Sequence, residues 1–235
     1  MVLSLDEVDS LGTIRAEDLR RLAQASPRVK RFLDESVYNP ETGGYTRNGE
    51  AVPYAEIQAL LEFEQQRLNL RFEDATTSYL DGETTLEEWE RKVAGESKTA
   101  FVIITLLVFG GLALLSRNPQ SRQIWKQTGE TLREHLRGVN GFSMHVESGD
   151  RSAKQLQAYV GYKARGIRPL YAKLRKQAAI SAGFTEARRF LDPSSQHCPQ
   201  CPGYERFEWV PIDEIVPVGE ACDCQGRCRC RVQYR

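Results

Sequence analysis

Apolar residues recur every three or four positions over much of this chain, and that spacing predicts a mainly α-helical body. The longest predicted helix runs from Tyr54 to Leu80, where acidic residues separate the apolar ones. Shorter helices are predicted over residues 15–25 and 26–34, the second after a Ser-Pro pair that suits a helix start. Another helix is predicted over residues 120–137.

Turn-forming residues separate these helices. Residues 37–53 contain Gly-Gly and Asn-Gly pairs, which predict a small β-hairpin with Tyr38 and Tyr45 on its arms. Thr84 and Glu87 have the spacing of a capping box and predict the start of a further helix.

The most apolar part of the chain is the uncharged run over residues 99–115. It is close to the shortest run that can span a bilayer, for which about 20 apolar residues are usual. We expect a central helix buried by other helices or by a subunit interface. Insertion into a membrane is the alternative.

Charge is divided unevenly along the chain. The totals are 32 Lys+Arg and 32 Asp+Glu, so the net charge is zero. Residues 1–98 hold 12 basic and 20 acidic residues (12 − 20 = −8), and residues 99–235 hold 20 and 12 (20 − 12 = +8). We therefore expect the two halves to contact each other, or different partners, through opposite charge.

A long basic helix is predicted over residues 152–182, after a glycine-rich link over residues 138–150. One interpretation is a solvated face balanced by the acidic N-terminal helices. The other is contact with DNA phosphates, independent of base sequence, or with an acidic protein. The residues predicted to make that contact are Arg165, Arg168, Lys173, Arg175 and Lys176.

All six cysteines lie near the C-terminal end, in the pattern His197-Cys198-x2-Cys201 followed by Cys222-x-Cys224-x3-Cys228-x-Cys230. Structural zinc takes four thiolate or imidazole ligands, often from a Cys-x2-Cys turn joined to a second pair. We predict a structural Zn²⁺ held by the first pair and two distal thiols. Arg227, Arg229 and Arg231 are expected to offset the charge of the thiolates. Disulfides and unligated buried thiols are the alternatives.

The tail resembles the C-terminal signature of the bacteriophage minor head (head-morphogenesis, Mu F-like) protein family. The pattern combines His-Cys-x2-Cys, a Trp-x-Pro segment, a Pro-x-Gly turn and a closing Cys-x3-Cys-x-Cys. Its matching positions here are His197, Cys198, Cys201, Trp209, Pro211, Pro217, Gly219, Cys224, Cys228 and Cys230. Cys222 is extra to the pattern, so the distal metal ligands are expected among Cys224, Cys228 and Cys230. Weaker similarity extends upstream to about residue 80.

The resemblance implies a structural virion component, a minor capsid protein near the portal vertex that acts in head assembly. Its implied partners are portal and capsid proteins, further copies of itself and packaged double-stranded DNA. The implied location is the virion, and the host cytoplasm during assembly. An ejection protein whose apolar helix enters the host membrane and a zinc-dependent nuclease remain as alternatives.

No enzyme motif stands out, since the chain lacks His-Glu-x2-His, Gly-x-Ser-x-Gly and phosphate-binding Gly-x4-Gly-Lys patterns. We therefore expect no catalytic residues. The predicted fold is mainly α, with long helices and a small cysteine-rich, zinc-ribbon-like C-terminal subdomain. Its predicted parts are an acidic helical region with a hairpin (1–80), a helical body (81–192) and the cysteine-rich subdomain (193–235).

Overall fold

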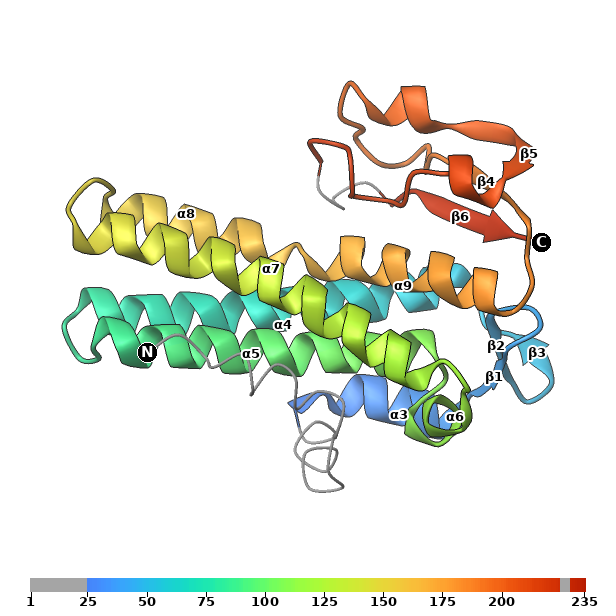
Figure 1. Ribbon diagram of the computed structural model, residues 1–235, viewed down its shortest axis with the longest axis horizontal. Coiled ribbons are helices and arrows are strands. Elements are labelled where there is room, and N and C mark those ends of the chain that lie inside the picture. The colour runs from blue at the N-terminus through green and yellow to red at the C-terminus, as the bar shows by residue number, and fades with distance from the viewer. Residues whose placement is uncertain (1–24, 225–228) are drawn as a thin grey trace.

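A computed structural model describes residues 25–224 and 229–235 (Figure 1). The predicted helix over residues 15–25 therefore lies almost wholly outside the described residues, as do Arg227 and Cys228. The helices are α3 (Pro27–Glu35), α4 (Tyr54–Leu80), α5 (Leu86–Val108), α6 (Leu112–Arg117), α7 (Ser121–Glu147), α8 (Ala153–Ala164) and α9 (Ile167–Ser181). The strands are β1 (Val37–Asn39), β2 (Gly44–Arg47), β3 (Glu50–Ala51), β4 (Glu186–Phe190), β5 (Arg206–Pro211) and β6 (Arg231–Tyr234). The fold is thus mainly α-helical with a small cysteine-rich β-module, as predicted.

Helix α5 is the centre of the helical body, where it contacts α3, α4, α7 and α9. Its side chains from Ala100 to Val108 are almost all buried, and Trp89 at its other end is fully buried. This confirms that protein covers the part of the apolar run that lies in α5, whereas Leu112 and Leu114 in α6 are exposed. Within the part of the chain that the structure describes, no helix is both long and apolar enough to cross a membrane.

The apolar run is not one helix, because α5 ends at Val108 and α6 begins at Leu112. Gly110 and Gly111 between them both have positive φ, which glycine adopts without steric cost. A Cβ on Gly110 would lie 2.5 Å from Cβ of Tyr38. The break therefore lets the hairpin pack closely against the end of α5.

The predicted hairpin is present, and its first two strands pair Tyr38 with Tyr45. A third short strand extends it to the order β1-β2-β3. The Tyr45 ring is buried against Phe32, and its hydroxyl donates to the carbonyl of Leu107. These contacts anchor the hairpin to the C-terminal end of α5.

Two predicted helix boundaries need correction. The link over residues 138–150 is mostly helical, because α7 continues to Glu147. Gly138 serves a helix contact, since a Cβ there would lie 2.9 Å from the hydroxyl of Tyr159 in α8. The basic helix over residues 152–182 is in turn broken into α8 and α9, with Arg165 and Gly166 at the junction.

Inside the body, His135 on α7 is a buried histidine. Its Nε2 lies 3.3 Å from Oγ of Ser97, and its ring packs edge-on against Phe101. Burial, with a smaller contribution from the positive charge of Lys163, lowers the pKa of His135 from 6.5 to about 3.

This pKa shift predicts a loss of stability in acid. Below pH 6.5 the unfolded chain binds a proton at His135 that the folded chain does not, down to about pH 3. The free energy of unfolding should therefore fall by about 1.4 kcal/mol per pH unit in this range from His135 alone. Urea denaturation of wild type and His135→Gln at pH 7 and pH 5 measures it. The variant should lose about 2 kcal/mol less than wild type, whereas the exposed control His145→Gln should match wild type. Equal losses in His135→Gln and wild type would refute the assignment.

Candidate metal centre

The C-terminal module is built on a three-stranded antiparallel sheet with the order β5-β4-β6. Its central strand β4 pairs Ala187 with Val210 of β5 and with Tyr234 of β6. Residues 186–190 thus belong to the cysteine-rich module, whereas the sequence analysis assigned them to the helical body. Burial alternates along β4, where Ala187 and Arg189 are fully buried. This alternation is typical of a strand, and the sequence analysis predicted no strand over these residues.

The module lies against α9 of the helical body (Figure 1). Ala172 packs with the buried cysteines, and Ala179 packs with Ala187 and Ile215. Lys176 Nζ donates to the carbonyl of Ile215 at 2.9 Å. The cysteine cluster is therefore held between its own loops and a helix of the body.

Four cysteine sulfur atoms lie within 4.8 Å of one another, those of Cys198, Cys201, Cys222 and Cys224. The separations are 3.4 Å from Cys198 to Cys201, 3.6 Å from Cys201 to Cys224 and 3.1 Å from Cys224 to Cys222. A tight turn forms the first pair, where the N–H of Cys201 donates to the carbonyl of Cys198. These four side chains can bind a metal ion.

Among the described residues, the cluster differs from the predicted ligands at Cys222 and Cys230, and the predicted ligand Cys228 lies outside the described residues. Cys222 belongs to the four-cysteine cluster, although the sequence analysis placed it outside the metal shell. Cys230 lies instead with His197 and Cys201 in a second group. Cys222 is absent from the family pattern, and it was therefore left out of the predicted ligands. The Cys222-x-Cys224 spacing could have indicated a ligand pair, because a short turn can direct both sulfurs to one ion.

Backbone N–H groups favour a thiolate in this cluster. Partial desolvation raises the pKa of the Cys198 thiol, but hydrogen bonds from the backbone of Cys224, Cys201 and Gln200 and from the Cys201 side chain outweigh it. The pKa of Cys198 is consequently below its ordinary value of 9.0. Since the thiolate is the form that binds metals, this environment suits a metal ligand.

A buried arginine supplies positive charge beside the cluster. Arg189 is fully buried, and its guanidinium lies 5.3 Å from the ring centroid of Tyr204, which packs against the cysteines. One nitrogen donates to the carbonyl of Val216 at 3.0 Å, while Nε and Nη2 have no hydrogen-bond partner among the described residues. An uncompensated buried cation is costly unless anionic groups lie nearby. Arg189 therefore fits a cluster that is negative when its thiolates hold a metal.

Of the three arginines expected to provide this charge, Arg229 and Arg231 point elsewhere, and Arg227 lies outside the described residues. Arg229 forms an ion pair with Glu62 on α4 at 3.0 Å, and Arg231 lies over the ring of Phe190. The sequence analysis did not identify Arg189, because only the strand alternation of β4 marks it as buried.

The five predicted DNA-contact residues do not form one exposed basic surface. Arg168 is buried and pairs with Glu62 at 2.9 Å, Arg175 donates to the carbonyl of Gly43, and Lys176 is bound to Ile215. Arg165 and Lys173 are half-buried. Three of the five charges thus join parts of the protein to one another.

Glu62 connects the two oppositely charged halves of the chain. Its carboxylate accepts from Arg168 on α9 and from Arg229 in the cysteine-rich module. The expectation that the acidic and basic halves contact each other is confirmed at this residue.

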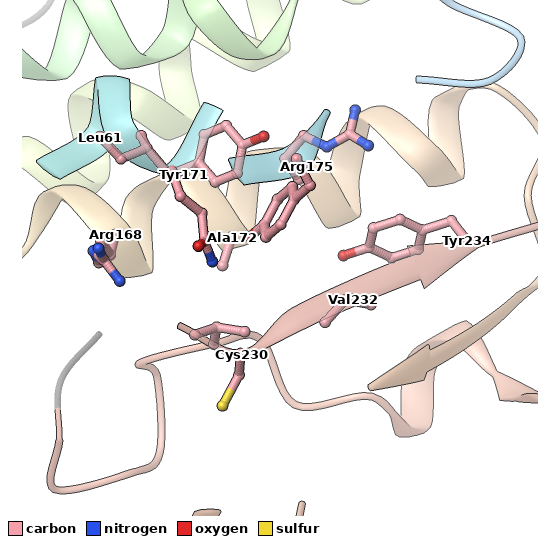
Figure 2. A pocket seen from close by; sticks show the side chains of 11 residues that line it. Leu61, Arg168, Tyr171, Ala172, Arg175, Cys230, Val232 and Tyr234 are labelled. Atoms are coloured by element: carbon pink, nitrogen blue, oxygen red, sulfur yellow. The ribbon is translucent and has the colours of Figure 1, made fainter. Parts of the chain in front are cut away.

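A cavity of about 80 Å³ lies where the module meets α4 and α9 (Figure 2). Tyr171, Tyr234 and Arg175 line it, and burial raises the pKa of both tyrosines well above the ordinary 10.0. The hydroxyls are therefore protonated at neutral pH and provide no base. Figure 2 shows the Cys230 sulfur directed away from α9, toward the module.

Comparison of the chain with protein-family models, with curated proteins and with solved structures gave no match in any of the three. The function must therefore be argued from the residues themselves.

Proposed function

We propose that this chain is a structural component of a bacteriophage head, and that a zinc ion holds its C-terminal module in the folded state. One observation carries the proposal: three cysteines of the family-like pattern, Cys198, Cys201 and Cys224, lie close together with Cys222, and two separate loops supply them. Three of the residues that carry the resemblance thus take part in a possible metal site.

The donor set favours zinc over other ions. Four thiolates in a small, closed site are typical of structural Zn²⁺, whereas calcium and magnesium require oxygen ligands. With Zn–S distances near 2.3 Å, a tetrahedral site has S–S edges of about 3.8 Å. Three of the six S–S separations are 3.1–3.6 Å and need only a small expansion to reach that value, and all six lie within 4.8 Å.

A structural role agrees with how the chain uses its polar groups. The buried histidine His135 has a pKa too low for proton transfer near neutral pH, and the tyrosines at the cavity are held protonated. Most of the predicted basic contacts stabilise the protein itself. The partners that the resemblance implies, portal and capsid proteins, remain the proposed ones, and partly exposed residues such as Arg165 and Lys173 are proposed to contact packaged DNA.

The proposal predicts that the chain copurifies with virus particles. Particles from an induced culture of the bacterium that carries the gene would be banded by density and probed with an antibody to this chain. We expect the chain in the DNA-containing band, and we expect a deletion strain to yield few or no filled heads. A chain found only in the soluble fraction, with normal heads in the deletion strain, would overturn the proposal.

A further inference from the structure

The described residues of the cysteine-rich module contain two groups of potential metal ligands, and Cys201 belongs to both. The first group is the four-cysteine cluster; the second consists of His197, Cys201 and Cys230, whose ligand atoms lie within 4.8 Å of one another. Cys201 is fully buried and Cys230 is 2% exposed. Cys230 and His197 therefore form a second donor pair close to the shared sulfur.

The hydrogen bonding of His197 prepares it to bind a metal. Its Nε2 lies 2.7 Å from the carbonyl oxygen of Asp192, which can only accept, so Nε2 carries the proton. In the neutral ring the lone pair is then on Nδ1, which lies 3.8 Å from Sγ of Cys230. A metal-binding histidine commonly donates its other N–H to a carbonyl in this way, which fixes the tautomer and the ring orientation.

We propose that the module binds two zinc ions that share the Cys201 thiolate. The first ion takes Cys198, Cys201, Cys222 and Cys224; the second takes Cys201, His197 and Cys230, and its fourth position is open to water or another donor. This inference rests on the proposed zinc site and extends it.

Charge balance favours the pair of ions over a single one. Four thiolates with one Zn²⁺ carry −4 + 2 = −2, whereas five thiolates with two Zn²⁺ carry −5 + 4 = −1. The buried Arg189, whose guanidinium lies over the ring of Tyr204, carries one positive charge, which matches the smaller negative charge better. Because desolvated net charge is unfavourable, the second ion lowers the cost of burying the cluster.

Metal content of the full chain, purified under reducing conditions, tests the proposal. Native mass spectrometry and elemental analysis should find two zinc ions per chain in wild type. His197→Ala and Cys230→Ser should each bind one, while the control His145→Ala, at an exposed histidine outside the module, should keep two. One ion in both wild type and His197→Ala would overturn the shared site and leave the four-cysteine site intact. No zinc in wild type would overturn both.

Cobalt provides a second test that does not depend on the folding of a variant. Co²⁺ added to the metal-free chain should give thiolate charge-transfer absorption with the first equivalent. With the second equivalent the paramagnetic resonance signal per cobalt should fall, because a bridging thiolate couples the two spins. A signal that grows in proportion to cobalt up to two equivalents, or binding that stops at one, would contradict a shared Cys201.

Discussion

Removal of the metal is expected to unfold the C-terminal module while the helical body stays folded. The core of the module is small, with Cys201, Cys222 and Cys224 among the few buried residues of its main cluster. Structural zinc sites in small peptides contribute on the order of 10 kcal/mol, more than such a core can replace. The helical body has a separate and much larger core that contains none of these cysteines.

Hydrogen exchange read by mass spectrometry would resolve the two parts. After chelation, amides of β4, β5 and β6 should lose protection, and those of α5 should keep it. Cys201→Ser should reproduce the effect without a chelator, and the exposed neighbouring change Ala221→Ser should not. Protection of β4 that survives both chelation and Cys201→Ser would contradict a metal-dependent module.

Glu64→Ala is expected to destabilise the helical body by about 1–3 kcal/mol, because it leaves the buried donors of Arg67 and Ser26 without their acceptor. The Glu64 side chain is fully buried on α4, where it accepts from Arg67 Nε at 2.9 Å and from the hydroxyl of Ser26. Arg67 also pairs with Glu96 on α5, so the network connects α4, α5 and the start of α3.

Chemical denaturation monitored by helical circular dichroism would measure the change. Glu87→Ala is the matched control, since Glu87 forms an exposed pair with Arg91 on one helix turn. Exposed pairs of this kind contribute up to about 0.5 kcal/mol. A loss at Glu64 no larger than that at Glu87 would show that the buried network does not stabilise the body.

The local elements could be predicted where one sequence pattern dominates. The predicted bounds of α4 agree with the structure at both ends, and the Tyr38–Tyr45 hairpin pair is present. The capping box lies one residue later than predicted, at Thr85 and Glu88. Thr84 and Thr85 each carry a side-chain hydroxyl, and each is followed three positions later by a glutamate. The sequence pattern therefore fits both positions equally well.

The errors occur where a tertiary contact decides the outcome. Gly138 looked like a linker residue, but it sits in a helix so that Tyr159 can donate to its carbonyl at 2.8 Å. Arg168 and Arg175 looked like surface charges, but neighbouring elements accept their hydrogen bonds. At the cluster, spacing predicted a cysteine site and two of its thiols, Cys198 and Cys201, yet it could not choose among the distal thiols. That choice depends on how the loop after β5 returns to the first pair.

The strand order β5-β4-β6 also has a consequence for the sequence of folding events. The helical core draws on residues from Val29 to Ala178, all of which precede the module on a growing chain. By contrast, β4 gains its second neighbour only when β6 has been synthesised, after both cysteine loops. Contacts between distant segments form slowly, and domains generally fold in the order of synthesis. The helical body should therefore be complete first, and α9 then serves as the template on which the late module acquires its metal and closes.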